Sequence, residues 1–318
     1  MSSSEFSIID DFFTVKSTKG LPPILGVGDD CAVLDVPNDK QLAISTDTLV
    51  EGVHFLVNSE PQSLGHKVLA VNLSDLAAMG ATPTWASLAI TLPSINEEWL
   101  AAFSKGFFEL AEKHSLHLVG GDTTQGPLSI TITIMGLLQK HRRLTRSGAK
   151  VGDSIYVSGA IGNAGLGLLK SRSGVVDLND HDVAAYVRPS PRVQLGQQLL
   201  GMASSCIDVS DGLAADLNHI LQQSGVGATI QHQDLPLTDS VQQHMIDIAD
   251  EVWPYSTGDD YELCFTLPSI VNIDSIDQRL EKKITKIGVI EEQAGLRIQA
   301  KSGELINFSK GYEHFNGK

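Results

Sequence analysis

The order of strand-like and helix-like segments in this 318-residue sequence predicts a mixed α/β (α+β) fold in two domains. The segment 129–134 alternates strictly between polar and apolar residues, which is typical of a strand with one buried face. The segment 97–114 repeats apolar residues at helical spacing. A chain of this length forms a core in each of two domains. We expect the domain boundary within the basic, glycine-containing stretch His141–Gly152, which gives domains of residues 1–148 and 149–318.

The individual elements follow from the same periodicities. Strands of the first domain are expected at Gln41–Thr46, Trp85–Leu92, His117–Val119 and Ser129–Ile134. Its helices are expected at Phe6–Phe13, Ser63–Met79 and Glu97–His114. Either Ser94, in a capping box with Glu97, or Asn96 caps the third of these helices. In the second domain we expect strands at Ser154–Ser158, Glu262–Thr266 and Lys286–Ile290, and helices at Ala164–Lys170, Val193–Met202 and Leu213–Gln223.

Composition excludes several classes of protein. The net charge of −15 argues against nucleic acid as a partner, because a phosphate backbone needs basic patches. No apolar stretch reaches the roughly 18 to 20 residues that span a bilayer. The N-terminus lacks the pattern of a secretion signal, so the cytoplasm is the expected location. The three cysteines, Cys31, Cys206 and Cys264, are too scattered for a disulfide framework and are expected to be small buried hydrophobes.

Acidic residues interrupt apolar segments at several separate places. They are Asp29 and Asp30, Asp47, Asp75, Asp122, Asp208 and Asp211, and Asp259, Asp260 and Glu262. A buried, unpaired carboxylate is very costly, and few basic residues occur in these segments. Mg²⁺ prefers oxygen ligands and binds one or two carboxylates together with substrate phosphates. The pattern therefore predicts several magnesium ions, held by aspartates that gather in space.

Other interpretations of each motif remain open on these residues alone. Any one aspartate is as well explained by a turn or a helix cap. Gly120-Gly121-Asp122 can present backbone N–H groups to an anion, whereas Arg142, Arg143 and Arg146 suit either phosphate or solvent. The glycines at 159, 162, 165 and 167 favour tight packing over a phosphate loop. The sequence contains neither a Walker A loop nor the protein-kinase motifs, so ATP would be held mainly through metal ions.

Seven motifs together resemble the thiamine-monophosphate kinases over nearly the whole chain. They begin at Leu25 (LGVGDDCA), Ile44 (ISTDTLV), Val71 (VNLSDLAAMG), Gly120 (GGDTT), Leu144 (LTRSGA), Ile207 (IDVSDGL) and Gly258 (GDDYEL), and the closing KGYEHF at Lys310 also fits. The resemblance implies the two-domain fold of aminoimidazole-ribonucleotide synthetase, with the N-terminal sheet pairing across a homodimer. It implies ATP and thiamine monophosphate as substrates and thiamine diphosphate as product.

The resemblance also implies roles for individual residues. Metal ligands are expected at Asp30, Ser45, Thr46, Asp47, Asp75, Asp122, Asp208 and Asp211. Nucleotide contacts are expected at Gly121, Asp122, Arg146 and Ser210, and contacts to the thiamine moiety at His54, Glu262 and Tyr312. Asp47, Asp122 and Arg146 would carry catalysis, by positioning and by stabilising charge during direct in-line transfer. The roles of Asp29, Asp259 and Asp260 stay open.

Three alternative functions are compatible with parts of the pattern. One is another ATP-dependent synthase of the same superfamily; selenophosphate synthetase would need a reactive Cys with a nearby Lys, which the context of Cys31 lacks. A two-metal phosphohydrolase would release phosphate from ATP without an acceptor. A non-catalytic metal-binding module would bind metal without ATP turnover.

Overall fold

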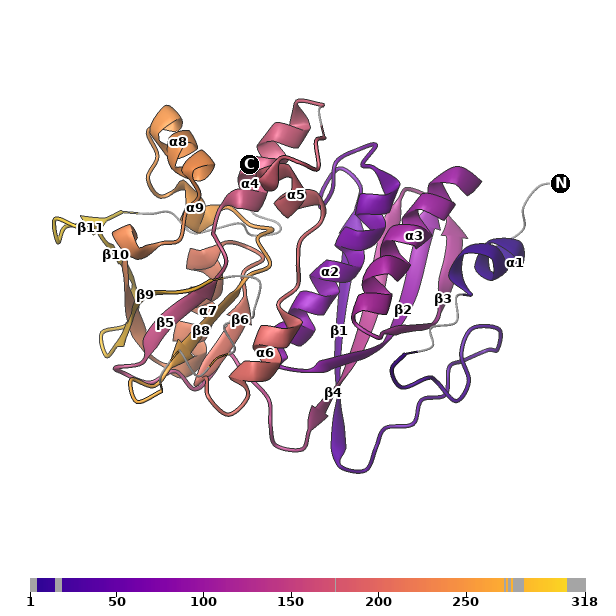
Figure 1. Cartoon of the computed structure of the whole chain (residues 1–318), viewed down its shortest axis with the longest axis horizontal. Helices are drawn as coiled ribbons and strands as arrows, with labels where there is room; N and C mark the ends of the chain where they lie inside the picture. Colours follow the sequence, from indigo (N-terminus) through magenta and orange to yellow (C-terminus); the bar gives the residue numbers. More distant parts are fainter. Residues whose placement is uncertain are drawn as a thin grey trace. The chain divides into compact units, whose positions relative to one another are not determined.

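A computed structural model describes residues 5–14, 19–174, 176–271, 273, 276 and 283–307 and shows two compact units (Figure 1). The first unit comprises the chain up to Leu76 together with Ala81–His141, and the second comprises Ala77–Gly80 and the chain from Arg142 onward. Each unit contains one β-sheet with helices. The predicted mixed α/β class is therefore confirmed.

The first unit is built on a four-stranded sheet in the order β1-β4-β2-β3. Its strands are β1 (Lys40–Val50), β2 (Thr82–Leu92), β3 (His117–Gln125) and β4 (Ser129–Gln139). Its helical segments are α1 (Glu5–Ile8), the π-helical turn Ile9–Phe13, α2 (Pro61–Met79) and α3 (Glu97–Lys113). The order leaves β1 and β3 as the two edge strands of the described sheet.

The two faces of this sheet differ. Along β4, Ile130, Ile132 and Ile134 are buried while the side chains between them are half-buried, as the strict alternation predicted. The buried face packs on α2, because a Cβ on Gly136 would lie 3.0 Å from the Leu76 side chain. Figure 1 shows α2 and α3 on the same side of this sheet. The helices therefore cover one face, and Thr131 and Thr133 lie on the other.

Two strands extend further than the sequence predicted. Strand β1 continues through Asp47 to Val50, and β3 continues through Asp122 to Gln125. The extra length comes from pairing with neighbours, since β1 matches β4 residue by residue out to the pair Val50–Ser129. Asp47 and Asp122 consequently lie inside edge strands and not at strand ends. At the start of α3, the Asn96 side chain accepts the Trp99 N–H, so Asn96 is the cap and not Ser94.

The second unit contains a seven-stranded mixed sheet in the order β11-β10-β7-β9-β5-β8-β6. The strands are β5 (Ser154–Ser158), β6 (Ser205–Asp208), β7 (Gly227–Gln231), β8 (Leu263–Leu267), β9 (Ile284–Glu291), β10 (Gly295–Gln299) and β11 (Leu305–Ile306). The helices are α4 (Asn163–Arg172), α5 (His181–Val187), α6 (Val193–Leu199), α7 (Leu213–Ser224), α8 (Asp239–Ile248) and α9 (Trp253–Ser256), with a 3₁₀ turn at His232–Asp234.

The core of the second unit packs α7 against its sheet. Leu213, Leu217 and Ile220 of α7 are buried with Ile155 of β5 and Ile207 of β6. The prediction missed α5, α8, α9, β7, β10 and β11, whose sequences are short or only partly apolar. No helix among the described residues is long and apolar enough to cross a membrane.

Candidate active site

A carboxylate pair lies on the helix-covered side of the first sheet. Asp47 of β1 and Asp75 of α2 approach each other, and the Ser45 hydroxyl donates to Asp75 Oδ2 at 2.5 Å. Burial, the charge of Asp75 and a hydrogen bond with Asp75 raise the pKa of Asp47 to about 6. The three residues come together because Ser45 and Asp47 are two positions apart on one strand and therefore share a face. Two like charges at close range create a site that favours a cation.

The chemistry of this pair fits a hard divalent cation. Its donors are carboxylate and hydroxyl oxygens, which Mg²⁺ prefers. One turn before Asp75, the Asn72 Oδ1 atom is buried and has no hydrogen-bond partner in the described part of the chain. No group of three or more His, Cys, Asp or Glu side chains among the described residues is arranged to hold a metal ion. The pair thus fits an ion that also takes ligands from water and substrate, which is how Mg²⁺ usually binds.

Asp30, Gly121 and Asp122 line a separate cavity of about 810 Å³ within the first unit. The loop 26–32 and the edge strand β3 form much of its wall, and Ser87 and Met135 contribute from β2 and β4. The exposed Cys31 is part of this wall, so the expectation that it would be buried is wrong, whereas Cys206 and Cys264 are buried. The structure therefore brings the predicted Asp30, Gly121 and Asp122 together around one cavity.

The strand register separates this cavity from the carboxylate pair. Asp47 stands opposite Ile132, then Leu88, then Gly121, in one row across the sheet. Because side chains alternate along a strand, Asp122 points to the opposite face from Asp47. Three strand spacings of about 4.8 Å also place these residues roughly 14 Å apart. Asp47 and Asp122 of one chain are thus too far apart to hold one ion at the 2.0–2.1 Å that Mg²⁺ requires.

Thr46 and His54 lie near the carboxylate pair in sequence but in different settings. Thr46 is exposed on the open face and pairs through its hydroxyl with Thr133 at 2.9 Å. His54 lies in the turn after β1, where its Nδ1 accepts the Val50 N–H at 3.0 Å. This bond places the proton of the neutral imidazole on Nε2.

In the second unit, Asp208, Ser210 and Asp211 lie in a tight turn between β6 and α7. The Asp216 side chain on the first turn of α7 fixes this turn, because its Oδ2 accepts the N–H groups of Ser210 and Asp211, each at 3.0 Å. Burial and the charges of Asp208 and Asp211 raise the pKa of Asp216 to about 8, against the effect of the two N–H groups. The predicted Asp208, Ser210 and Asp211 are thus brought together around a carboxylate that the sequence analysis did not single out.

Glu262 lies beside this turn. The Val209 N–H donates to the Glu262 carbonyl at 2.8 Å, which joins the end of β6 to the start of β8. The Glu262 carboxylate is buried in an ion pair with Arg192 and also accepts the Ser158 hydroxyl at 2.5 Å. Sequence reasoning missed Arg192 because it lies in a proline-rich turn (Pro189-Ser-Pro-Arg) that matches no motif, 70 positions from its partner.

Arg146 is exposed in a loop that runs beside β6. The neighbouring Thr145 carbonyl accepts the Cys206 N–H at 2.9 Å, and the Ser224 hydroxyl of α7 accepts the N–H groups of Gly148 and Ala149. Arg146 therefore projects from a fixed loop close to the strand that ends at Asp208. Tyr312 lies outside the described residues.

Asp260 has a structural role that the sequence left open. Its carboxylate accepts the N–H of Gly162 at 2.7 Å and that of Ala164 at 3.2 Å, at the start of α4. Burial raises the pKa of Asp260 to about 8, and these two N–H groups oppose the rise. The glycine-rich segment before α4 is thus no phosphate loop, since an internal carboxylate already occupies the helix start. Its glycines serve close packing, as predicted: a Cβ on Gly165 would lie 1.6 Å from Thr257 Oγ1.

Known families match both halves of the chain. Residues 28–138 match the AIR synthase related protein, N-terminal domain, and residues 150–301 match the corresponding C-terminal domain. The chain is 46% identical to the thiamine-monophosphate kinase of Escherichia coli (strain K12), with 99% of each chain covered.

Two solved structures extend the comparison. The thiamine-monophosphate kinase of Stenotrophomonas maltophilia K279a is 39% identical, with a TM-score of 0.82 over 96% of this chain and 99% of that one. AaThiL complexed with AMPPCP and TMP is 31% identical, with a TM-score of 0.77 over 98% of this chain and 97% of that one.

The two domain matches and the two-sheet architecture define a member of the AIR synthase related proteins. Within that group, the chain belongs to the thiamine-monophosphate kinase family.

Proposed function

We propose that this protein transfers the γ-phosphoryl group of ATP to the phosphate of thiamine monophosphate, which yields ADP and thiamine diphosphate. The observation that carries the proposal is 46% identity to a thiamine-monophosphate kinase over 99% of both chains. The carboxylate pair of Asp47 and Asp75 supports it, because it meets the need of a kinase for metal ions beside phosphates. AaThiL, which resembles this chain over 98% of its length, was solved with AMPPCP and TMP. The consumption of ATP favours the cytoplasm as the place of action.

Magnesium ions are the proposed cofactor. The residues that would hold them are Asp30, Ser45, Thr46, Asp47, Asp75, Asp122, Asp208 and Asp211. When bound, Mg²⁺ offsets the repulsion between the negative charges of the two substrates. Arg146 adds positive charge from its exposed loop, and Gly121 and Ser210 are the proposed contacts to the nucleotide. Asp216 holds the turn that carries Asp208 and Asp211 in one conformation.

Transfer by this arrangement is direct. An oxygen of the acceptor phosphate forms a bond to the γ-phosphorus of ATP while the bond from that phosphorus to the β,γ-bridging oxygen breaks. The leaving ADP keeps the electron pair of the broken bond. The acceptor is largely a dianion at neutral pH, because the second pKa of a phosphate monoester is about 6, so the step needs no general base. The residues of this chain serve to bind and orient the two substrates.

We further propose that the protein is a homodimer in which the first sheet pairs with that of a second copy. Within one chain, Asp47 and Asp122 lie on opposite edge strands and opposite faces. An uncovered edge strand as long as β1 is prone to pair with other chains and aggregate. Its Ile44 is 60% exposed, which adds to this tendency unless a second copy covers the strand. Pairing β1 of one chain with β3 of another places the strand that carries Asp47 beside the strand that carries Asp122 of the second copy.

The proposed reaction is tested by incubation with ATP, Mg²⁺ and thiamine monophosphate. Mass spectrometry is expected to detect thiamine diphosphate in amounts equal to the ADP formed. Release of inorganic phosphate without thiamine diphosphate would instead identify a phosphohydrolase. Rapid quenching is expected to trap no phosphorylated enzyme.

The homodimer is tested by mixing two inactive variants, Asp47→Asn and Asp122→Asn. If each site takes one of these residues from each chain, a hybrid dimer contains one intact site. With random mixing, about a quarter of wild-type activity returns, because half of the dimers are hybrids with one intact site of two. No return of activity in a mixture whose chains demonstrably exchange would contradict the shared site.

A further inference from the structure

Asn72 is a buried side chain on α2 whose amide is only half satisfied. Its nitrogen, Nδ2, donates to the Val68 carbonyl one turn earlier at 2.9 Å. Its oxygen, Oδ1, has no hydrogen-bond partner in the described part of the chain, and the residue is 0% exposed. A buried acceptor without a partner destabilises a fold, which makes Oδ1 a candidate for contact with a ligand.

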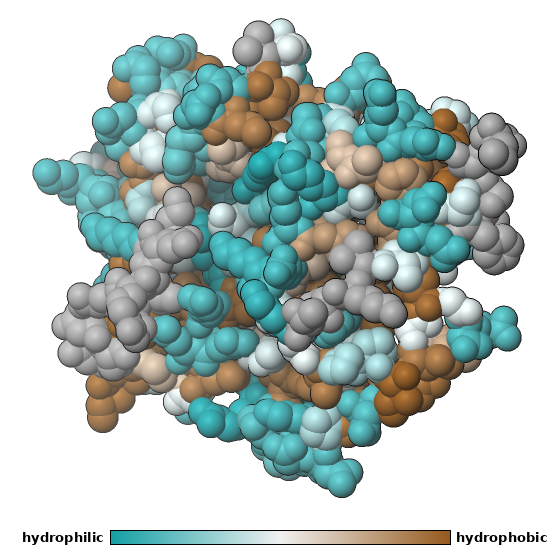
Figure 2. Space-filling view, turned by 45° about the vertical axis from the view of Figure 1, so that its right-hand side comes forward, coloured by the Kyte–Doolittle hydropathy of each residue, from teal (hydrophilic) through white to brown (hydrophobic). Residues whose placement is uncertain are grey.

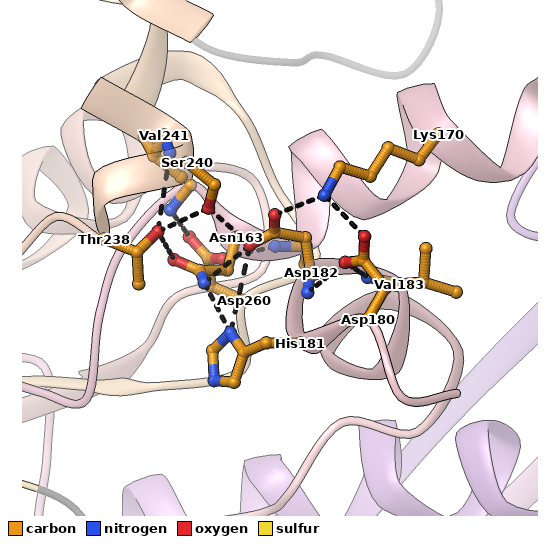
Figure 3. A network of polar contacts seen from close by, with 12 residues as sticks. Asn163, Lys170, Asp180, His181, Asp182, Val183, Thr238, Ser240, Val241 and Asp260 are labelled. Atoms are coloured by element: carbon orange, nitrogen blue, oxygen red, sulfur yellow. Dashed lines mark hydrogen bonds and ion pairs between the residues drawn. The ribbon is translucent and has the colours of Figure 1, made fainter. Parts of the chain in front are cut away.

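A buried asparagine of the second unit shows the satisfied pattern (Figure 3). Asn163, at the start of α4, is 2% exposed. Its Nδ2 donates to Asp182 at 2.9 Å, and its Oδ1 accepts the Thr238 hydroxyl at 3.3 Å. Both ends of that amide join α4 to neighbouring segments, whereas only the nitrogen of Asn72 has such a contact.

Helix geometry places Asn72 on the side of α2 that carries Asp75. The two residues are three positions apart, so their side chains are neighbours on the helix surface. Helix α2 leads through a short turn into β2, so helix and strand run antiparallel. Strands β1 and β2 are both antiparallel to β4 and therefore parallel to each other. Helix α2 thus runs antiparallel to β1.

The contact between α2 and β1 fixes the level of Asn72 along the strand. The Ser45 hydroxyl donates to Asp75, so these two residues lie at one level. From Asp75 back to Asn72 the helix covers about 4.5 Å, and from Ser45 forward to Asp47 the strand covers about 6.6 Å. Because the elements run antiparallel, both moves go in the same direction. Asn72 therefore lies near the level of Asp47.

A hydrated Mg²⁺ ion would supply the donor that Asn72 Oδ1 lacks. The site offers the carboxylates of Asp47 and Asp75 and the Ser45 hydroxyl, fewer than the octahedral set of oxygen ligands that Mg²⁺ demands. Water molecules complete such a set, and each of them has hydrogens to donate. A neutral amide oxygen accepts one of these hydrogens without adding to the negative charge of the pair.

We propose that Asn72 is a positioning residue for the metal ion held by Asp47 and Asp75. Its Oδ1 accepts a hydrogen bond from a water molecule on the ion, and its bond to Val68 holds the amide in place. Contacts of this kind, beyond the direct ligands, change metal affinity by roughly 10- to 100-fold. The inference rests on the proposed function and deepens it, because it adds a residue that favours an ion that keeps its water.

The experiment follows the unfolding temperature of the nucleotide-free protein during titration with Mg²⁺ alone. An ion that binds only the folded state raises this temperature by mass action. Asn72→Leu keeps the size of the side chain without an acceptor, so its titration is expected to be displaced to about 10-fold higher Mg²⁺ or more. With Ca²⁺, which takes more ligands in a more flexible geometry, the displacement is expected to stay under about threefold.

A second variant, Asn72→Asp, retains an acceptor oxygen. It is expected to respond at Mg²⁺ concentrations no higher than the wild type does. Without metal, Asn72→Leu is expected to unfold at the wild-type temperature or above, since the buried acceptor is removed.

Ser74→Ala is the matched control. Ser74 lies on the same helix, is 0% exposed, and its hydroxyl also has no partner among the described residues. Two positions along a helix amount to a rotation of about 200°, so Ser74 lies on the opposite side from Asn72. Its variant is expected to reproduce the wild-type titrations with both ions.

Three results would overturn the assignment. One is a Mg²⁺ titration of Asn72→Leu that coincides with that of the wild type. Another is an equal displacement with Mg²⁺ and Ca²⁺ together with a lower metal-free unfolding temperature, which would make Asn72 a structural residue. The third is a wild-type protein that does not respond to Mg²⁺, which would remove the metal site itself. Formation of thiamine diphosphate tests the proposed function separately, so the first two results can occur in an active kinase.

Discussion

The acidic residues of the two units are surrounded by different chemistry. In the first unit, Asp47 faces a second carboxylate, that of Asp75, and both the proximity and burial raise its pKa to about 6. In the second unit, Asp216 and Asp260 each accept two backbone N–H groups, and Glu262 is paired with Arg192. The Asp47 carboxylate thus faces another carboxylate, whereas Asp216, Asp260 and Glu262 are each bound by hydrogen-bond donors, with Asp208 and Asp211 also near Asp216.

This difference shows which acids hold the structure and which await a ligand. A carboxylate that accepts backbone N–H groups stabilises the loop that carries them. Two carboxylates side by side destabilise the fold until a cation binds between them, so their presence indicates a function. The two units contain similar acidic motifs, and only the contacts tell the two roles apart.

The largest effect is expected from Asp47→Asn. The amide keeps the size of the side chain but removes the charge of a proposed metal ligand, so turnover should fall by about 10³-fold or more at saturating Mg²⁺. Without Mg²⁺ the same variant should be as stable as the wild type, or more stable by up to about 2 kcal/mol, because the repulsion with Asp75 is removed. Steady-state kinetics and urea unfolding measure the two effects.

Near-normal turnover of Asp47→Asn would contradict the distinction between ligand-binding and structural acids, since Asp47 would then be one more structural acid. A large loss of stability would do the same. Ser45→Ala, which removes only the hydroxyl that donates to Asp75, serves as the milder reference.

For Asp216→Ala, in contrast to Asp47→Asn, the main expected effect is a loss of stability. It leaves the N–H groups of Ser210 and Asp211 without their acceptor, at a cost of about 3 kcal/mol in the free energy of unfolding. Asp216→Asn retains an acceptor oxygen and should lose less. Urea unfolding of both variants gives the comparison, and unchanged stability in Asp216→Ala would place Asp216 among the ligand-binding acids instead.

The smallest effect is a dependence on pH that comes from Asp260. Its pKa is raised from 3.8 in the unfolded chain to about 8 in the folded one, so the folded state retains a proton that the unfolded state has lost. The stability that this proton contributes is complete below about pH 4 and is lost as the pH rises through 8. The stability difference between wild type and Asp260→Asn should therefore shift toward the variant by about 1 kcal/mol from pH 7 to pH 9.

Urea unfolding at pH 5, 7 and 9 measures this shift. Asp260→Asn is an apt reference because its amide resembles the protonated carboxyl but does not titrate. A difference that stays constant with pH would mean that Asp260 is ionised throughout, held in that form by the N–H groups of Gly162 and Ala164.

The sequence predicted those parts of the fold whose signals are local. Ser129–Ile134 shows its alternation in six residues, and α2 and α3 show their periodicity over several turns. The ends of β1 and β3 were not predictable, because pairing with neighbouring strands, and not local sequence, carries them past Asp47 and Asp122. On the face displayed in Figure 2, hydrophilic and hydrophobic residues intermingle, so the hydropathy of single residues does not predict which part of the surface is functional.

Only those residues of the candidate site that belong to a recognisable motif could be predicted from the sequence. The resemblance supplied Asp75 and Glu262 as site residues, but no motif indicates that Arg192 would hold Glu262, since the contact joins residues 70 positions apart. Asp216 gave a weak signal, as an acid in the first turn of the helix that follows Asp211-Gly212. Whether the acids of the two units share one set of ions stays a prediction.

The Asp260 carboxylate at the start of α4 affects how this protein interacts with the abundant anions of a cell. An open helix start attracts phosphate and nucleotides, which the cell contains at high concentration. By filling this position with Asp260, which stands only two positions before Glu262 in the sequence, the chain excludes such competitors from the start of α4. Substitution of that aspartate by glycine would be the simplest way for evolution to open a new anion pocket in this protein.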